Sequence, residues 1–361
     1  MSRDDMYREH VFLAPHTTVG LGGRARYFST CTSVQEIQQS LIWAEERDMP
    51  VQVLGGGSNI VFADAGFDGL VVKVDLRGVY FDEQGEWCVV RTQAGEDWDR
   101  LVQLCIDRGL GGIECLSGIP GLAGATPMQN VGAYGQEVGE VITSVKALDR
   151  TTGEVVEFAR EACDFAYRQS RFKRQDRDRF ILVEVSYRLQ RNGRPHLRYA
   201  ELKRHVEETV DLDGLESGRA ALQAVRRAVL DLRRRKSMVV DVADPNSRSV
   251  GSFFLNPVVS QGQFVEIEKR WAAMGGEGEV PSFVSDEGIK VPAAWLVERA
   301  GFARGLRRGG VGVSENHALA LVNWDGTARE LLALAEEIRG GVADKFGVQL
   351  EREPVVVGAT D

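Results

Sequence analysis

Two glycine-rich segments have the composition of loops that bind a ligand through the main chain. Residues 117–135 read SGIPGLAGATPMQNVGAYG, and residues 55–59 read GGGSN directly after a short apolar run. Glycine accepts positive φ and lets a ligand approach the backbone, while Pro120 and Pro127 lower the entropy cost of an ordered loop. Free N–H groups in such loops suit a phosphate or a flat polar ring. A nonperiodic connector as long as residues 117–135 is uncommon unless it binds something, so we expect it to contact a ligand.

A third glycine segment, residues 20–25, matches the G-x-G-x-x-A pattern of dinucleotide-binding folds. That pattern requires a preceding strand and a following helix, but here residues 16–18 are polar and residues 25–29 are β-like. We therefore interpret it as a tight turn. Residues 55–59 do follow a candidate strand, lack the Lys-Ser or Lys-Thr pair of a Walker loop, and alone fit a β-turn equally well. Two such loops outside a Rossmann context favour a dinucleotide held by main-chain contacts.

Three further stretches carry side chains that suit acid, base or charge chemistry. Residues 167–173, YRQSRFK, are basic and flanked by aromatic residues, a composition that alone is typical of a solvated surface. Residues 251–257, GSFFLNP, place a serine between a glycine and two aromatic residues, where it either caps a turn or faces a ligand. Glu351 and Glu353 share one face of a predicted strand, for which exposed glutamates on an edge strand are the simpler interpretation.

The amino-acid composition is that of an acidic globular protein. The 361 residues include 44 Lys and Arg and 53 Asp and Glu, and the net charge is −9. Surfaces that follow phosphate backbones need clustered basic residues, so we expect no nucleic-acid partner, and we interpret the basic run at residues 233–236 as a solvated helix end. Five cysteines without a C-x-x-C pair predict packed, reduced thiols and no metal site. No signal peptide or spanning segment is apparent, so we expect a cytoplasmic protein without a membrane partner.

The length corresponds to about two to three domains, and apolar periodicity predicts an α+β chain. In the predicted helix at residues 219–235, leucines and valines form one stripe, and we expect five arginines, including Arg226 and Arg233, on the other face. Residues 241–249 are interpreted as a flexible link or mobile loop. The other expected helices are residues 34–48, 98–108, 264–274, 293–300 and 331–346; the expected strands are residues 51–54, 60–62, 70–75, 87–92, 141–149, 154–158, 180–189 and 348–357.

Together these segments resemble the UDP-N-acetylenolpyruvoylglucosamine reductases, the MurB flavoenzymes of peptidoglycan synthesis. LGGGSNIVF, SGIPG with PMQNVGAYG, YRQSRFK, GSFFLNP and LERE occur in that family's order and approximate spacing, and the likeness covers nearly the whole chain. The resemblance implies a vanillyl-alcohol-oxidase-like (PCMH-type) α+β fold, with a two-part FAD-binding domain and an α+β substrate-binding domain. It divides the chain into residues 1–79 and 80–235 for non-covalent FAD, joined by a returning strand at 347–361, and residues 236–346 for the substrate.

The resemblance also implies the reaction: NADPH-dependent, FAD-mediated reduction of UDP-N-acetylglucosamine enolpyruvate to UDP-N-acetylmuramate by a monomeric oxidoreductase. By motif position, Arg168 is similar to the family's catalytic arginine, Ser252 to its proton donor and Glu353 to its catalytic glutamate, with Glu351 as the alternative because a proline follows Glu353. The implied substrate contacts are Tyr167, Tyr199, Lys236, Asn256 and Lys290. The implied cofactor contacts are Leu54, Gly55, Gly56, Gly57, Ser58, Asn59, Ser117, Gly118, Ile119, Pro120, Gly121, Gly124, Ala125, Asn130, Gly132 and Ala133.

Two other interpretations have distinct signatures. Another PCMH-type flavin oxidoreductase, an oxidase acting on an alcohol or a sugar, would turn over with oxygen and without an enolpyruvyl substrate. A non-catalytic protein that binds FAD or a sugar nucleotide would have no need for Arg168, Ser252 and Glu353 together.

Overall fold

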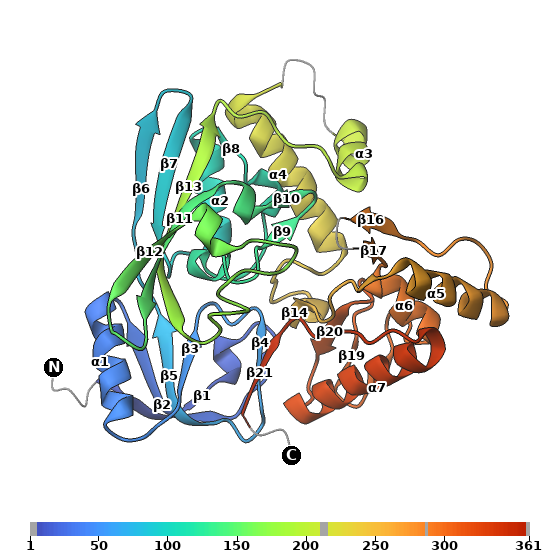
Figure 1. Ribbon diagram of the computed structural model, residues 1–361, viewed down its shortest axis with the longest axis horizontal. Helices are drawn as coiled ribbons and strands as arrows, with labels where there is room; N and C mark the ends of the chain where they lie inside the picture. The colour runs from blue at the N-terminus through green and yellow to red at the C-terminus, as the bar shows by residue number, and fades with distance from the viewer. Residues whose placement is uncertain (1–5, 210–215, 286–287, 359–361) are drawn as a thin grey trace. The chain divides into compact units, whose positions relative to one another are not determined.

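The computed structural model describes residues 6–209, 216–285 and 288–358, and the chain divides into two compact units (Figure 1). The first unit comprises Met1–Val11, Ala25–Gly56 and Asp68–Val239, and the second comprises Phe12–Arg24, Gly57–Phe67 and Val240–Asp361. This division differs from the three parts inferred from the sequence, since residues 347–361 cluster with the second unit. The functional three-part division stays a prediction.

One sheet of the first unit has four strands in the order β1-β2-β5-β3. The glycine segment at residues 55–59 begins where β3 ends. Strands β3 and β5 pair in parallel, and helix α1 buries Ile37 and Ala44 in the same hydrophobic cluster as Leu70 and Val72 of β5. The Ser33 side chain accepts from the Glu36 N–H and so begins α1. The bounds are β1 Arg8–Phe12, β2 Arg24–Cys31, α1 Val34–Glu45, β3 Val51–Leu54 and β5 Phe67–Val74.

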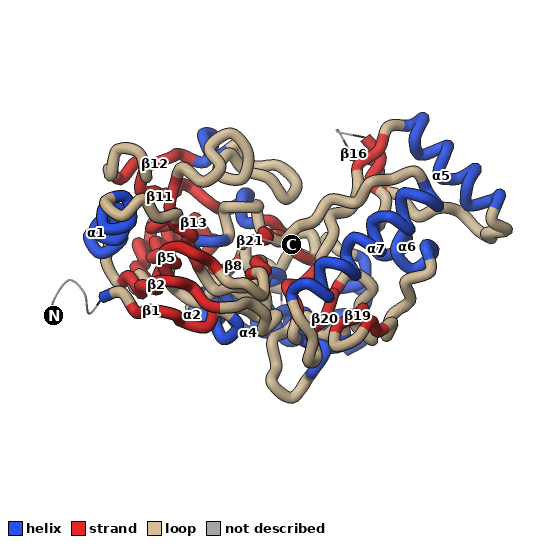
Figure 2. The backbone as a smooth tube through the Cα atoms, turned by 90° about the horizontal axis from the view of Figure 1, so that it is seen from below, coloured by secondary structure: helices blue, strands red, loops and turns tan. Residues whose placement is uncertain are grey.

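A second, antiparallel sheet supports the longer loop. Its strands run in the order β12-β11-β13-β7-β6, with β8 paired to β13, and Figure 2 shows β11 and β13 side by side. Helix α2 buries Trp98, Leu101 and Cys105 in the cluster that contains Tyr187 of β13. The bounds are β6 Val79–Gln84, β7 Trp87–Gln93, α2 Trp98–Asp107, β8 Leu110–Gly111, β9 Gly132–Ala133, β10 Gln136–Glu137, β11 Ile142–Asp149, β12 Val155–Ala159, β13 Phe180–Arg191, α3 Ala200–Thr209 and α4 Gly218–Arg235.

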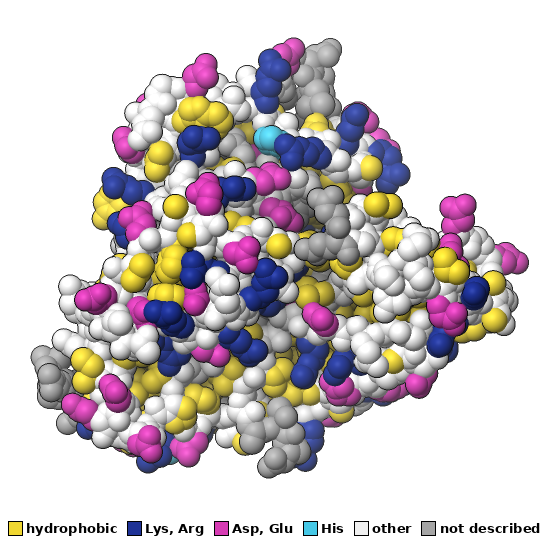
Figure 3. Space-filling model, in the orientation of Figure 1, with side chains coloured by type: hydrophobic (Ala, Val, Ile, Leu, Met, Phe, Trp, Pro, Cys, Tyr) yellow, Lys and Arg dark blue, Asp and Glu magenta, His cyan; other side chains and the backbone are white. Residues whose placement is uncertain are grey.

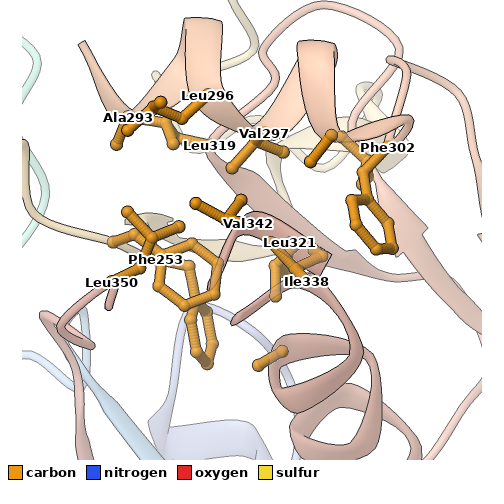
Figure 4. Packing of buried hydrophobic residues seen from close by; sticks show 14 of the residues in the cluster. Phe253, Ala293, Leu296, Val297, Phe302, Leu319, Leu321, Ile338, Val342 and Leu350 are labelled. Carbon is orange, nitrogen blue, oxygen red and sulfur yellow. The ribbon is translucent and has the colours of Figure 1, made fainter. Parts of the chain in front are cut away.

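The second unit encloses a separate core in which Phe253 is fully buried. Figure 4 shows the Phe253 ring near Leu350 and Val342, with helix α6 contributing Leu296 and Val297. Helix α7 begins with a capping box between Thr327 and Glu330. The bounds are β4 Ile60–Phe62, β14 Ser249–Ser252, β15 Val258–Val259, α5 Gln261–Ala273, β16 Phe283–Ser285, β17 Gly288–Lys290, α6 Ala293–Ala300, β18 Arg307–Arg308, β19 Val311–Val313, β20 Ala320–Asn323, α7 Ala328–Phe346 and β21 Val355–Val357.

Several expectations about local structure are wrong. The closing strand is only β21, Val355–Val357, which pairs in parallel with β4. Residues 241–249 do form a loop, which contains a 3-10 turn, Pro245–Ser247, and leads into β14; the mobility expected for it stays a prediction. Arg226 and Arg233 of α4 are buried, not solvated, because they lie at the border of the apolar stripe.

The surface chemistry agrees with the composition. Basic and acidic side chains are interspersed on the face shown in Figure 3. All five cysteines are buried, as expected. Among the described residues, no helix combines the length and the apolar character that a membrane span requires.

Candidate active site

The two predicted ligand loops meet within the first unit, backbone against backbone. Leu54 ends β3 in the core, and Gly55 and Gly56 follow it. A Cβ atom on Gly56 would lie 2.7 Å from the Cα of Gly121, closer than real Cβ contacts come. Gly121 itself has φ of +122°, a conformation that favours glycine. The structure therefore brings residues far apart in sequence into a contact that a side chain at position 56 would disrupt.

The start of the longer loop is fixed by hydrogen bonds to the surrounding chain. Ser117 is fully buried, and its Oγ donates to the carbonyl of Glu114 (2.7 Å). The Gly118 N–H donates to Asp99 Oδ1 (2.6 Å), and the Gly124 N–H donates to the Ala94 carbonyl (3.0 Å). The expectation that the loop amides are free is therefore wrong for Gly118 and Gly124, whose N–H groups shape the loop instead.

Asp99 joins this loop to helices α2 and α4. Arg226 donates to its carboxylate through Nη1 (2.5 Å) and Nη2 (2.8 Å), a bidentate pair. Burial of Asp99 favours the neutral acid, but the hydrogen bonds from Arg226 and from the Gly118 N–H outweigh it and lower the pKa of Asp99. The carboxylate is therefore ionised at neutral pH and holds Gly118 in place.

Glu114 is a second carboxylate that holds the loop, and unlike the half-buried Asp99 it has no exposed surface. Its carboxylate accepts from the Gly112 N–H (2.7 Å), from Gln136 Nε2 (2.8 Å) and from the His196 N–H (2.9 Å). It thereby links the residues before the loop to β10 and to the segment that leads to Tyr199. Neither Asp99 nor Glu114 was identified from the sequence, because their partners are distant along the chain.

Arg168 lies against the second half of the loop. Its Nη2 donates to the Gly132 carbonyl (2.6 Å) and its Nη1 to the Asn130 carbonyl (3.4 Å). Its φ is +54°, uncommon for a residue with a side chain. Asn130 is buried and its amide donates to Glu137 (2.7 Å), so this side chain shapes the loop. Tyr167 adjoins the Arg168 guanidinium, 5.6 Å from ring centre to Cζ.

Two predicted substrate contacts, Tyr199 and Lys236, converge near the end of the loop. The Tyr199 ring packs edge to face on Tyr134, with 5.6 Å between centroids, and Lys236 Nζ lies 6.0 Å from the Tyr134 ring. Lys236 also forms an ion pair with Glu201 of α3 (2.7 Å). Burial raises the pKa of Tyr134 to about 12, so its phenol stays protonated at neutral pH. Tyr134 stands in the motif GAYG and could have been singled out from the sequence.

In the second unit, residues 57–59 lie beside the segment that contains Glu353. A Cβ on Gly57 would lie 1.9 Å from the His16 carbonyl oxygen, so this position also requires glycine. Asn59 Nδ2 donates to the Glu353 carbonyl (3.3 Å), and the Val355 N–H donates to the Asn59 carbonyl (3.1 Å). Ser58 lies between these two positions, in the turn before β4.

Ser252 and Glu353 belong to neighbouring segments of the second unit. The Glu353 N–H donates to the Phe253 carbonyl (2.9 Å), and the Leu255 N–H donates to the Glu351 carbonyl (3.0 Å). The strand predicted to carry both glutamates is absent here, since only Arg352 forms an isolated bridge, with Phe254. Ser252 and Glu353 are half-buried, whereas Glu351 is exposed.

The other two predicted substrate contacts lie nearby in the same unit. Asn256 Oδ1 accepts from the Ala293 N–H (2.8 Å) at the start of α6, and Lys290 pairs with Val258 between β17 and β15. The predicted residues thus form two sets. Arg168, Tyr167, Tyr199 and Lys236 lie in the first unit with most of the loop residues, and Ser252, Glu353, Asn256 and Lys290 lie in the second.

Comparison with known proteins identifies the cofactor of the domain that contains the glycine loops. Residues 25–159, which contain both loops, match the model of an FAD binding domain. The geometry fits this cofactor, because Gly56 and Gly121 keep a backbone surface clear of side chains where the loops meet. The chain is thus an FAD-binding flavoprotein of the α+β, PCMH-type class, which confirms the fold class and cofactor expected from the sequence.

The remainder of the chain specifies the family. Residues 244–357 match the C-terminal domain of UDP-N-acetylenolpyruvoylglucosamine reductase. Proteins of that name are 45% identical in Thermobifida fusca (98% of this chain, 99% of the relative) and 46% identical in Mycobacterium marinum (97% and 95%). A MurB crystal structure from Thermus caldophilus has the same fold, with a TM-score of 0.65 and 22% identity over 98% of this chain and 100% of that one. The chain belongs to the UDP-N-acetylenolpyruvoylglucosamine reductase family.

We predict that Asp99→Asn destabilises the protein by about 1–3 kcal/mol, because it removes the counter-charge of the buried Arg226 guanidinium, while the half-exposed carboxylate lets water screen part of the loss. Adding Arg226→Met should recover part of this loss, giving a coupling of about 1–3 kcal/mol in a double-mutant cycle measured by urea unfolding. Asp107→Asn is the matched control, since the Asp107–Arg219 pair joins the same two helices but its arginine is exposed; its loss should cost about 0–1 kcal/mol of stability.

The direction of the Asp99 pKa shift determines how the contribution of Asp99 to folding stability changes with pH. The pKa of Asp99 is lower in the folded protein than its unfolded value of about 3.9. Its stabilising effect is therefore fully present above that value and is lost as pH falls through the folded pKa. The stability gap between the wild type and Asp99→Asn should shrink below about pH 4, and a gap that widens there would contradict this assignment.

Proposed function

We propose that this enzyme reduces UDP-N-acetylenolpyruvoylglucosamine to UDP-N-acetylmuramate in peptidoglycan precursor synthesis, with FAD as cofactor, NADPH as reductant and residues of both units in named roles. The observation that carries the proposal is the meeting of the two glycine loops within the FAD binding domain match, together with Arg168, which is hydrogen-bonded to the second half of the longer loop. The family match over nearly the whole chain specifies the reaction. The enzyme is an oxidoreductase that acts on a small UDP-sugar.

When bound, FAD would supply the hydride chemistry that links NADPH to the vinyl carbon of the enolpyruvyl ether, and the residues described here would bind and polarise the substrate. The neighbouring carbon then carries negative charge that spreads into the substrate carboxylate. Arg168 is a fixed cation, already held by the Gly132 carbonyl, and stabilises this charge without reorganising. Glu353 orients the same group; its partial burial and its backbone bond to Phe253, next to Ser252, favour it over the exposed Glu351.

Ser252 completes the reaction by donating its Oγ proton to the carbanionic carbon. A serine hydroxyl is a weak acid, but the carbanion is strongly basic, so position matters more than a matched pKa. Ser252 ends β14 and is followed by the buried Phe253 and Phe254, which fix the local backbone and exclude water. Its location at the edge of a packed core suits a hydroxyl that must be held in one orientation.

Substrate binding is assigned to the remaining motif residues. Lys236 and Tyr199, gathered around Tyr134, take the diphosphate of the UDP-sugar. Asn256, Lys290 and Tyr167 take other polar groups of the substrate. We also propose that the enzyme works in the cytoplasm, where it meets a soluble nucleotide sugar. We expect it to be a monomer without nucleic-acid or membrane partners.

The reaction is tested with the purified full chain, which should be yellow from bound FAD. Anaerobic NADPH should bleach the flavin absorbance, and UDP-N-acetylenolpyruvoylglucosamine should restore it while UDP-N-acetylmuramate forms. Absence of bound flavin would contradict the FAD assignment. Recovery by oxygen with an alcohol or a sugar, but not by the enolpyruvyl substrate, would instead indicate an oxidase of the same fold.

Ser252→Ala separates the two half-reactions. Bleaching by NADPH should keep its wild-type rate, because no proton from Ser252 is needed there. Recovery of colour with the enolpyruvyl substrate should slow by about 10²- to 10⁴-fold, the usual contribution of a positioned proton donor. Stopped-flow absorbance measures both rates in one protein, so the first half-reaction serves as the control. Equal slowing of both would show that Ser252 is not the proton donor.

A further inference from the structure

Helix α3 lies beside helix α4 (Figure 1) and packs on it through an apolar face that includes one histidine. Leu202 and Val206 of α3 have no exposed surface and lie in one hydrophobic cluster with Val225 and Val229 of α4. His205 stands between them in the sequence and is also buried, with 6% of its surface exposed. The reaction described above gives this histidine no role, so a polar ring in an apolar face requires another explanation.

The histidine is hydrogen-bonded to the opposite helix. His205 Nε2 lies 2.8 Å from Asp231 Oδ2 of α4. Because a carboxylate accepts and does not donate, the imidazole carries a proton on Nε2 and donates it. Asp231 is half-exposed and also accepts from Arg235 Nη2 (2.7 Å), one turn further along α4. Asp231 thus joins a buried donor on α3 to an exposed donor on its own helix.

A second polar link joins the same two helices one turn away. Glu201, four residues before His205, forms an ion pair with Nζ of Lys236 (2.7 Å), the residue that follows α4. The earlier residue on α3 therefore meets the later residue on α4, as in an antiparallel pair. Hydrophobic contact is non-directional, whereas hydrogen bonds are directional. The two links therefore fix the rotation of α3 and its shift along α4.

The register of α3 determines the position of Tyr199, the residue just before the helix. The Tyr199 carbonyl accepts from the Lys203 N–H (2.9 Å), which is the first hydrogen bond of the helix, so its backbone moves with α3. On the loop side, a Cβ atom at Gly135 would lie 3.6 Å from the Tyr199 nitrogen. Burial raises the pKa of Tyr199, so its phenol is protonated at neutral pH and can donate to an anionic oxygen.

We propose that His205 and Asp231 are positioning residues for substrate binding, whose hydrogen bond holds α3 in the register that places the Tyr199 hydroxyl for the diphosphate of the UDP-sugar. The inference rests on the proposed function, which assigns Tyr199 to that diphosphate. A contact with a part of the substrate that does not react stabilises the bound substrate and the transition state equally. A displaced Tyr199 therefore weakens binding and leaves the chemical step unchanged.

The test uses the purified full chain with FAD bound. Calorimetry on the oxidised protein gives the Kd of UDP-N-acetylenolpyruvoylglucosamine, which is not reduced there, and steady-state assays with NADPH give kcat and KM. His205→Ala and Asp231→Ala each remove one side of the hydrogen bond, whereas His205→Gln keeps an N–H donor near the position of Nε2. Glu207→Ala is the matched control, because the exposed ion pair of Glu207 with Lys203 lies within α3.

His205→Ala and Asp231→Ala should each weaken substrate binding by about 3- to 20-fold, up to the effect of one hydrogen bond to a charged group. KM should rise with Kd, and kcat should stay within about twofold of the wild type. His205→Gln should recover most of the affinity, and Glu207→Ala should match the wild type. Tyr199→Ala should itself bind weakly, and adding His205→Ala to it should cause no further loss, because a positioning residue acts only through Tyr199.

Three results would overturn the inference alone. The first is wild-type affinity in both alanine variants with a lower unfolding temperature, which would leave the pair as a structural link. The second is a fall in kcat as large as the fall in kcat/KM, and the third is an additive loss in the Tyr199→Ala background. Wild-type affinity in Tyr199→Ala would contradict the substrate role of Tyr199 and the inference with it. A wild-type protein that does not reduce the enolpyruvyl substrate would contradict the proposed function itself.

Discussion

The close approach of two backbones, at Gly56 and Gly121, is the constraint on which the flavin-binding part of the molecule depends. The two glycines come from loops on different sheets, and a single methyl group at position 56 would push them apart. Their contact creates a surface of main-chain atoms, suited to a dinucleotide that is held without a Rossmann helix. Asp99, Glu114 and the Ala94 carbonyl then hold the shape of the longer loop.

The longer loop is held by hydrogen bonds to charged side chains rather than by regular secondary structure. Residues 117–135 contain no α-helix and only short pieces of strand and 3-10 helix, so the loop needs partners from outside. Asp99 and Glu114 provide them, one through Arg226 and Gly118, the other through Gly112, Gln136 and the His196 amide. Such networks fix geometry when every member is satisfied.

Periodicity and motifs predicted much of the fold. Helix α6 was expected at residues 293–300 and is found there because an apolar stripe ends at Gly301, which adopts positive φ. Helix α7 begins three residues before the expected position 331, because the capping box from Thr327 to Glu330 extends the first turn. The length of the closing strand was overestimated. Residues 348–354 have a strand-like composition, but they bond to the neighbouring chain through irregular backbone contacts, and only β21 is a strand.

The site was less predictable than the fold, for a physical reason. Short motifs singled out the two glycine loops, which the structure brings together at Gly56 and Gly121, whereas the roles of Arg168 and Ser252 stay predictions. They could not identify Asp99 with Arg226, 127 residues apart, since nothing local distinguishes a buried ion pair from two solvated charges. For the same reason Arg233 was placed on the solvated face of α4, although the packed helix buries it.

The central claim, that the contact of Gly56 with Gly121 forms the flavin site, is tested most directly by the flavin content of Gly56→Ala. The added methyl group meets the Gly121 backbone at 2.7 Å, so FAD affinity should fall about tenfold or more while circular dichroism stays that of the wild type. Gly340→Ala, whose Cβ would meet nothing within 4 Å on helix α7, should keep its full flavin. A Gly56→Ala protein purified with one tightly bound FAD per chain would contradict the account.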